Sequence, residues 1–185
     1  MKFLKIFNKN IVNTIEMINY IFDLDDTIYI HKHSKFFNGS IHYDLIQEKP
    51  LLKYYLNLCK GPKYIYTNAT YSHADTVLKK MNLSDGFEKI YSRDTMKLMK
   101  PHLESAISVQ KDILYHNNLN KFSNKLSNNQ RDQYIFFDDL LSNLEMAKKL
   151  GWKTIWIHPN FHKKIMYDFI DRSYPDLVTA LRELI

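Results

Sequence analysis

A short apolar run that ends abruptly in acidic residues constrains the fold of this chain more than any other stretch. The run covers residues 18–22, is broken only by Asn19, and is followed by Asp23, Asp25 and Asp26. A β-rich run of this length bounded by polar residues is typical of a buried strand. Because a buried carboxylate is costly unless it is paired or binds a metal, acids at the end of such a strand predict a cation site. The alternative is an acidic turn, since Asp is common where strands end.

Strands and helices are expected to alternate along the rest of the chain. Further strands are predicted at residues 63–67, 87–91, 134–137 and 153–157, and helices at residues 50–60, 72–81, 102–116, 142–150 and 175–185. This alternation predicts an α/β fold with a mainly parallel sheet that helices cover on both faces. We expect residues 1–185 to form a single domain, with a shortened segment at 28–48 and a polar surface loop at 117–132.

The composition excludes some classes of protein and leaves others open. The chain is 45% hydrophobic, which is ample for a core, and carries a net charge of +6. The lysines are spread along the sequence, so a nucleic-acid partner is not favoured. The single cysteine, Cys59, excludes an internal disulfide and fits a reducing compartment. With no apolar run near the roughly 20 residues that span a bilayer and no signal-peptide core, we expect a cytoplasmic protein without membrane association.

Three of the expected strands end in groups suited to phosphate chemistry, and a lysine followed by proline lies between the last two. These residues are Asp23 with Asp25, Thr67, Lys100, and Asp138 with Asp139. Each signal is weak alone, but their order and their placement at strand ends are specific. A P-loop or dinucleotide-binding fold is excluded because the four glycines lie far apart. A phospho-accepting receiver domain would carry its paired acids first and its Lys-Pro late, and this chain has the paired acids last.

Four of these motifs resemble, in order, those of the haloacid dehalogenase superfamily of phosphatases. They are FDLDDT at residues 22–27, YTNA at 66–69, KP at 100–101 and FDD at 137–139. Within the superfamily the chain most resembles soluble pyrimidine 5′-nucleotidases, through the longer words FDLDDTIY and YTNATYSHA and the stretch from FFDD to LGWKT. The resemblance covers about residues 18–158. It implies a three-layer Rossmann-like α/β sandwich.

The resemblance implies that Asp23 is the nucleophile and Asp25 the general acid/base, while Thr67, Asn68 and Lys100 bind the transferring phosphoryl group. A carboxylate that attacks phosphorus forms an acyl phosphate, which splits one difficult step into two. Alternate residues of a strand face the same side, so the two acids can converge on one substrate. Thr67 has the alternative of being only a turn former.

The resemblance also implies a Mg²⁺ site made by Asp23, Asp138 and the backbone carbonyl of Asp25. A divalent cation would offset the repulsion between these carboxylates and a phosphate dianion. The residues expected to support the site are Asp139, Asn143 and Thr27. Two alternatives stay open: the pair at residues 138–139 could be acids at a helix N-terminus, and Lys97 could take the role of Lys100, although the following proline favours Lys100.

The segment between the first two motifs is short for this family. Only 39 residues separate Thr27 from Thr67, whereas similar proteins insert a helical cap there. We therefore expect a minimal cap. Leu140 stands where similar proteins often carry a small hydroxyl residue. The side chains of the shortened segment could overhang the site or only pack the loop, and they are His31, His33, Phe36, Phe37, His42 and Tyr43.

The expected function is a Mg²⁺-dependent phosphomonoester hydrolase that acts through an aspartyl-phosphate. Its substrate would be a phosphorylated small molecule, with nucleotides as one candidate. One alternative is a macromolecular substrate, either a phosphoprotein or a nucleic-acid end. A second subunit could instead close the open site in a homo-oligomer. The other alternative, from a different class, is a non-catalytic binding protein with the same fold.

Overall fold

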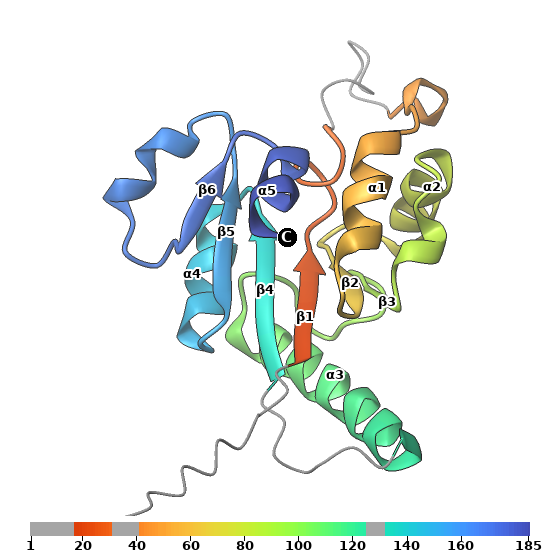
Figure 1. Ribbon diagram of the computed structural model, residues 1–185, viewed down its shortest axis with the longest axis vertical. Coiled ribbons are helices and arrows are strands. Elements are labelled where there is room, and N and C mark those ends of the chain that lie inside the picture. The colour runs from red at the N-terminus through yellow and green to blue at the C-terminus, as the bar shows by residue number, and fades with distance from the viewer. Residues whose placement is uncertain (1–16, 31–40, 125–131) are drawn as a thin grey trace, which may run out of the picture.

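The fold is built on a parallel sheet with the first strand near its centre. The computed structural model describes residues 17–30, 41–124 and 132–185. Among these residues six strands form one sheet in the order β3-β2-β1-β4-β5-β6, and every neighbouring pair is parallel (Figure 1). The strands are β1 Met17–Phe22, β2 Lys63–Tyr66, β3 Lys89–Tyr91, β4 Asp132–Asp138, β5 Lys153–Ile157 and β6 Arg172–Tyr174. The α/β class and the parallel sheet predicted from the sequence are confirmed.

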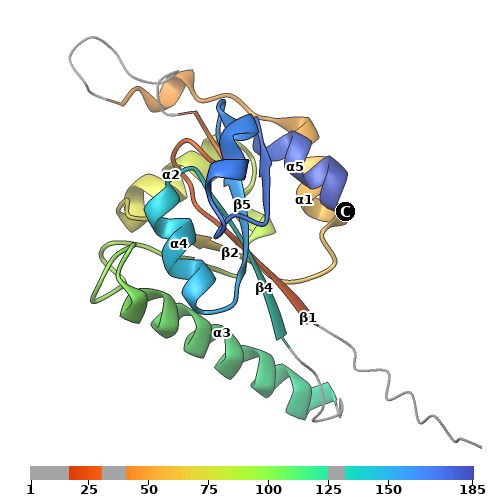
Figure 2. The same ribbon diagram turned by 90° about the vertical axis from the view of Figure 1, so that its left-hand side faces the viewer.

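Helices cover both faces of the sheet, as Figures 1 and 2 show. On one face lie α1, α2 and α5, and on the other lie α3 and α4. Their bounds are α1 Pro50–Leu58, α2 Tyr71–Lys80, α3 Leu103–Asn124, α4 Leu141–Lys149 and α5 Leu177–Leu184. Short 3₁₀ turns occur at Tyr43–Leu45, Ser84–Gly86 and Phe161–Met166.

The side chains of successive strand residues point to opposite faces of the sheet and pack into two separate layers of the core. In β1 the side chain of Ile21 packs with α3 and α4, whereas that of Phe22 packs with α1, α2 and α5. The ring of Phe22 stacks on that of Phe137 of β4, with 4.7 Å between the ring centroids. Both side chains are fully buried. The central strands are therefore apolar on both faces, as expected for a parallel sheet between two helical layers.

Local signals place most element ends where the sequence predicts them. Pro50 stands in the first turn of α1, where its missing N–H costs nothing. The side chain of Asp176 caps α5 by accepting a hydrogen bond from the Thr179 N–H at 2.8 Å. Gly151 follows α4 with a φ of 76°, a backbone conformation that glycine adopts without strain.

Two parts of the sequence prediction are wrong. The loop expected at 117–132 is helical as far as Asn124, because α3 continues through that stretch; residues 125–131 lie outside the described residues. The strand β6 was not predicted, because its three residues, Arg-Ser-Tyr, carry no apolar run.

The shortened segment contributes little regular structure. Between the tight turn at residues 24–29 and α1, the described residues hold one 3₁₀ turn, Tyr43–Leu45. Within the described part of the chain, no helix is long and apolar enough to cross a membrane.

Candidate active site

Strand register brings the two main acidic positions together. Phe22 of β1 pairs with Phe137 of β4, and the Asp23 N–H donates to the Phe137 carbonyl at 2.9 Å. The next residue along each strand, Asp23 and Asp138, therefore lies at the same carboxyl-terminal edge. This edge is where the strand order reverses between β1 and β4, the crevice in which open α/β sheets bind ligands.

A buried lysine joins these two carboxylates. Lys100 Nζ donates to Asp23 Oδ1 at 2.6 Å and to Asp138 Oδ2 at 2.7 Å. The side chains of Lys100 and Asp138 are 1% and 0% exposed, and that of Asp23 is 9% exposed. The sequence alternative, Lys97, is exposed. The structure thus brings together the three residues that the sequence singled out on separate elements.

The loop that carries Lys100 is anchored by Asn68, which follows β2. The Asn68 side chain donates to the Lys100 carbonyl at 2.9 Å and accepts from the Lys100 N–H at 3.0 Å. These two bonds fix the backbone of Lys100 and hence the direction of its ammonium group. Asn68 was expected to bind phosphate, and in the structure its side chain contacts the backbone of Lys100. It also lines the cavity, so phosphate binding by Asn68 remains a prediction.

Burial dominates the electrostatics of the acids. Burial raises the pKa of Asp23 to about 8, although the Lys100 ammonium opposes the rise. Burial and the adjacent Asp138 raise the pKa of Asp139 to about 7. Burial alone would lower the pKa of Lys100, but Asp138 and Asp23 outweigh it and hold the pKa above its ordinary value. Lys100 thus supplies one positive charge beside three carboxyl groups, and burial disfavours the ionised forms of Asp23 and Asp139.

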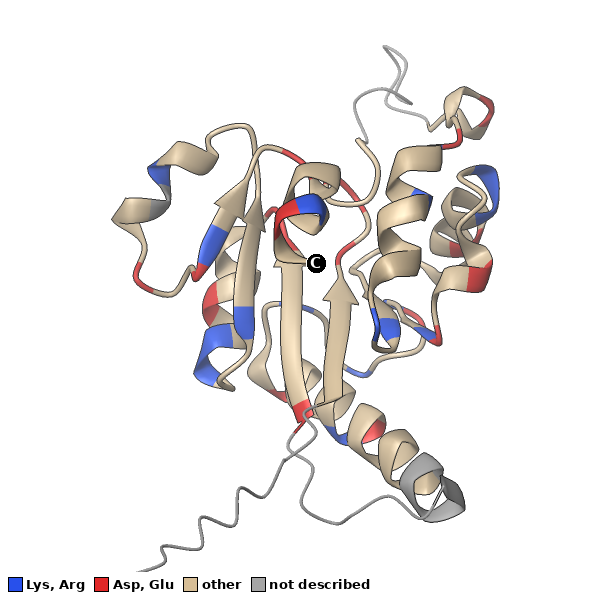
Figure 3. Ribbon diagram, viewed as in Figure 1, with Lys and Arg blue, Asp and Glu red and all other residues tan. Residues whose placement is uncertain are grey.

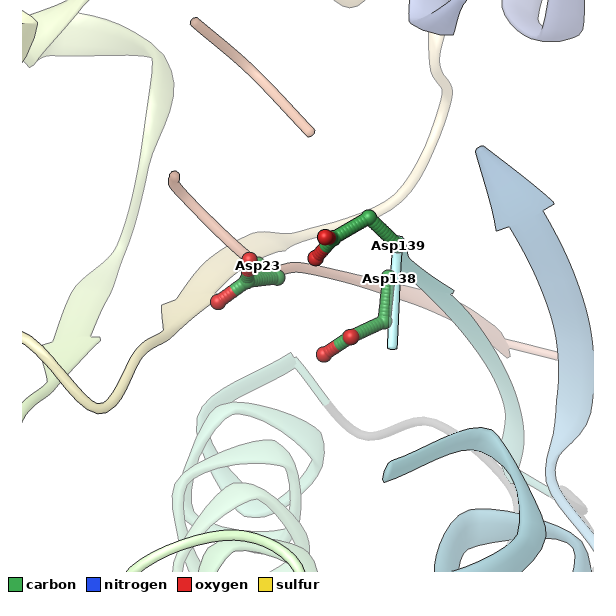
Figure 4. Close-up of side chains that lie close together, drawn as sticks. All are labelled: Asp23, Asp138 and Asp139. Atoms are coloured by element: carbon green, nitrogen blue, oxygen red, sulfur yellow. The ribbon is translucent and has the colours of Figure 1, made fainter. Parts of the chain in front are cut away.

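The same three carboxylates fit a divalent cation. One oxygen each of Asp23, Asp138 and Asp139 lies within 4.8 Å of the others, and Figure 4 shows these side chains at the ends of β1 and β4. The carboxyl oxygens of two buried residues and of the partly buried Asp139 suit Mg²⁺, which binds oxygen ligands. The carboxylate of Asp25 is not part of this group, and a contribution from its backbone carbonyl stays a prediction.

In Figure 3 acidic positions follow the tip of β1, while Lys and Arg are dispersed over both sides of the sheet.

A network of donors holds Asp138 in place. The Asn143 side-chain amide lies 3.0 Å from both Asp138 oxygens, and the Leu140 N–H donates to Asp138 Oδ1 at 2.8 Å. Asn143, expected to support the site, therefore contacts Asp138, one of the expected metal ligands. Leu140 is half exposed and starts α4 without a side-chain cap, so the helix begins with support from Asp138.

A cavity of about 530 Å³ opens over these residues. It is lined by Asp23, Asp25, Thr67 and Lys100, and also by Arg93 from the loop after β3, which the sequence did not single out. The Arg93 Nε–H donates to the Asn68 carbonyl at 2.9 Å. Thr67 is buried, and its Oγ1 accepts from the Ala69 N–H at 3.0 Å.

The turn after β1 aims Asp25 at a residue that sequence reasoning missed. The N–H groups of Ile28 and Tyr29 both donate to the Leu24 carbonyl, and Asp26 adopts a φ of 58° to close the turn. Asp25 Oδ1 lies 3.0 Å from Nε2 of His73, in the first turn of α2. His73 belongs to the word YTNATYSHA, and its position one turn beyond the motif was the signal that could have found it.

Some predicted residues lie apart from the cavity or outside the described chain. Thr27 is buried but lines a different cavity with Lys49 and Leu177, and its Oγ1 has no hydrogen-bond partner among the described residues. Tyr43 lines the active-site cavity, whereas His42 is exposed. The other candidates of the shortened segment lie outside the described residues and are His31, His33, Phe36 and Phe37.

Solved structures with the same fold come from several bacteria. A putative β-phosphoglucomutase from Thermotoga maritima has a TM-score of 0.60 at 15% identity, over 91% of this chain and all (100%) of that chain. A putative haloacid dehalogenase hydrolase from Bacillus subtilis, bound to magnesium, has a TM-score of 0.60 at 12% identity, over 91% and 99%. A haloacid dehalogenase-like hydrolase from Streptococcus pneumoniae has a TM-score of 0.56 at 17% identity, over 91% and 99%. At these identities the likeness shows the fold alone.

The sequence itself decides the family. No protein of curated function matches it significantly. A family model described as haloacid dehalogenase-like hydrolase matches residues 30–157, a stretch that begins after Asp23 and Asp25 and includes Lys100 and Asp138. This match spans well over half of the chain and agrees with the fold, so the chain belongs to the haloacid dehalogenase-like hydrolase family.

Proposed function

We propose that the protein is a Mg²⁺-dependent phosphomonoester hydrolase that acts through an aspartyl-phosphate at Asp23. The contact of Lys100 Nζ with both Asp23 and Asp138, at 2.6 and 2.7 Å, is the observation that carries this proposal. It holds a buried positive charge beside the proposed nucleophile, at the floor of the cavity. Such preorganised charge is what phosphoryl transfer requires, because catalysis of that reaction is mainly positioning and electrostatic stabilisation.

The proposed reaction has two steps that share one acid/base. In the first, Asp23 Oδ attacks phosphorus, the bond to the ester oxygen breaks, and that oxygen takes a proton from Asp25. In the second, a water molecule gives a proton to Asp25 and attacks phosphorus, which releases inorganic phosphate and restores the Asp23 carboxylate. Lys100 stabilises charge on the phosphoryl oxygens in both steps.

The shortage of positive charge beside the three carboxyl groups supports Mg²⁺ as the proposed cofactor. Burial raises the pKa of Asp23 to about 8, so the ionised form that must attack phosphorus is disfavoured by burial and is stabilised by added positive charge. When bound by Asp23, Asp138 and Asp139, Mg²⁺ would keep the nucleophile ionised and polarise a phosphate oxygen. The cluster of three carboxyl groups therefore supports the proposal of a divalent cation at this place.

Within the phosphomonoesters we propose small substrates, with pyrimidine nucleoside monophosphates first in the order of testing. Words shared with soluble pyrimidine 5′-nucleotidases support that choice. The cavity, about 530 Å³, is in the usual range for small-molecule sites. Arg93 at its lining could pair with a second anionic or polar group of the leaving alcohol.

The test is hydrolysis of 4-nitrophenyl phosphate, followed by a panel of nucleotides, sugar phosphates and phosphopeptides, with Mg²⁺ or with EDTA. We expect turnover only with Mg²⁺, and loss of turnover to background in Asp23→Asn. A denaturing quench and mass spectrometry should find a phosphoryl adduct on Asp23.

Asp85→Asn is the matched control, because Asp85 is an exposed acid in the turn Ser84–Gly86 and should retain full turnover. Undiminished turnover in Asp23→Asn would refute the assigned nucleophile. A wild-type protein inert toward the whole panel would favour the non-catalytic alternative.

A further inference from the structure

A buried histidine contacts the carboxylate to which the proposed mechanism gives the proton transfers. His73 Nε2 lies 3.0 Å from Asp25 Oδ1, and His73 Nδ1 lies 2.9 Å from the hydroxyl of Tyr43. The side chain of His73 is 9% exposed, compared with 28% for Asp25. These contacts join three segments that are far apart in sequence: the turn after β1, the 3₁₀ turn Tyr43–Leu45, and the start of α2.

The direction of these hydrogen bonds follows from the chemistry of the partners. An ionised carboxylate only accepts, so Nε2 of His73 must carry the hydrogen that is donated to Asp25. In neutral imidazole the other nitrogen, Nδ1, is then an acceptor, and the Tyr43 hydroxyl donates to it. Tyr43 therefore selects the tautomer of His73 that presents an N–H to Asp25. Oδ1 of Asp25 then accepts this N–H, an arrangement that favours Oδ2 as the oxygen that exchanges a proton with the substrate.

The imidazole is held by its surroundings as well as by its hydrogen bonds. Thr70 caps α2, and its Oγ1 accepts from the His73 N–H at 3.3 Å. The rings of Tyr29 and Tyr43 pack beside the imidazole, with centroid distances of 6.0 and 5.7 Å. A side chain fixed at its backbone, at both ring nitrogens and on its sides has little rotamer freedom. It can therefore hold its partner in one rotamer.

We propose that His73, oriented by Tyr43, is the positioning residue of the general acid/base: it holds Oδ1 of Asp25 so that Oδ2 delivers the proton to the leaving oxygen. This assignment rests on the function proposed above. In the first step the Oδ2–H bond breaks as the new O–H bond of the leaving alcohol forms, and in the second step a proton of the attacking water returns to Oδ2. His73 keeps its own proton throughout. The shortened segment thus has a catalytic use, since it supplies Tyr43.

The experiment compares two substrates of similar shape. In 4-nitrophenyl phosphate the leaving group departs without protonation, whereas phenyl phosphate has a poorer leaving group that needs the acid. For His73→Leu we expect kcat/KM for phenyl phosphate to fall on the order of 10²-fold, the lower end of what general acid catalysis contributes. For 4-nitrophenyl phosphate it should fall much less, and KM should be unchanged for both. Tyr43→Phe, which removes one hydroxyl, should shift the ratio of the two kcat/KM values in the same direction by a smaller factor.

His73→Gln tests rescue, because the glutamine amide nitrogen can take the place of Nε2 and donate to Asp25. It should restore much of the kcat/KM for phenyl phosphate that His73→Leu loses. Tyr71→Phe is the matched control for Tyr43→Phe, since Tyr71 lies exposed in the same region and should leave the ratio unchanged. Circular dichroism and thermal unfolding check that each variant folds.

The outcomes separate this proposal from the function on which it rests. Equal losses for the two substrates in His73→Leu and Tyr43→Phe, or no loss in either variant, would overturn the positioning role while leaving the phosphatase intact. If His73→Leu does not fold, Tyr43→Phe alone decides between these results. A wild-type protein that hydrolyses neither substrate with Mg²⁺ would overturn both proposals.

Discussion

At the scale of single residues, the position of Lys100 decides the character of the site. One ammonium group lies between two buried carboxylates, so its removal leaves two charges without compensation. A buried pair of this kind adds little net stability compared with an apolar core, but breaking it by removing one partner is costly. The lysine to which we assign phosphate binding therefore also stabilises the crevice.

The first prediction concerns Lys100→Met, which keeps most of the side-chain volume and removes the charge. We expect hydrolysis to be lost and the free energy of unfolding at pH 8 to fall by about 3–5 kcal/mol, because buried carboxylates are left unpaired. Urea unfolding measures the second effect. Lys97→Met is the matched control, since Lys97 is exposed on the same loop and should leave both quantities unchanged. Loss of activity in Lys97→Met with activity retained in Lys100→Met would reverse the assignment.

The residue scale also shows what sequence reasoning can and cannot reach. Asp23, Thr67 and Asp138 were predictable because each stands at the end of an apolar strand, and parallel strands end at one edge. His73 stands in the word YTNATYSHA, but its contact with Asp25 was not predictable, because Asp25 lies 48 positions earlier in the chain and no local pattern joins the two. Contacts of this kind depend on how a turn and a helix approach each other in three dimensions.

At the scale of elements, the length of α3 also depends on a contact between residues that are far apart in the sequence. Its last turns are rich in Asn and Lys, and the sequence therefore predicted a loop from residue 117. In the structure Asn117 is buried, and its amide donates to the side-chain oxygen of Asn19 in β1 at 3.1 Å. The same Asn19 interrupts the apolar run of β1. A buried polar pair between strand and helix thus explains both irregularities, and neither residue could be matched to the other from sequence alone.

The second prediction concerns Gly61, which lies in the loop before β2 and close to the backbone of β1. A Cβ at Gly61 would lie 1.8 Å from the carbonyl oxygen of Ile18 in β1. That strand pairs with β2 and β4, so its backbone cannot move aside cheaply. We expect Gly61→Ala to lower the free energy of unfolding by about 1–3 kcal/mol, as overpacking does.

Gly86→Ala is the comparison for this prediction, because a Cβ at Gly86 meets nothing within 4 Å. Both variants are measured by urea unfolding, with the slope of free energy against urea as a check for two-state behaviour. Equal stability of the two variants would contradict the close approach between the loop and β1.

At the scale of the whole molecule, the acids of the site link folding to pH. The pKa values of Asp23 and Asp139 rise from 3.8 to about 8 and about 7, mainly because burial disfavours their charged forms. Between pH 4 and pH 8 these two groups therefore bind more protons in the folded protein than in the unfolded chain. Stability falls with rising pH wherever the folded state binds more protons. These two groups thus favour the folded state at acidic pH and oppose it as the pH rises toward 8.

The third prediction is that Mg²⁺ removes this cost, so its stabilising effect should grow from pH 5 to pH 8. The cation binds the ionised carboxylates, and at acidic pH it must displace protons before it can bind. At a concentration 100 times its dissociation constant it would add about 2.7 kcal/mol to the free energy of unfolding. Thermal or urea unfolding with MgCl₂, referred to EDTA at each pH, measures this difference. Asp138→Asn should abolish the effect of Mg²⁺ and Asp85→Asn should preserve it. The stabilisation by Mg²⁺ could instead stay constant over this pH range or survive in Asp138→Asn. Either result would mean that the cation binds elsewhere and does not neutralise the carboxyl groups of the crevice.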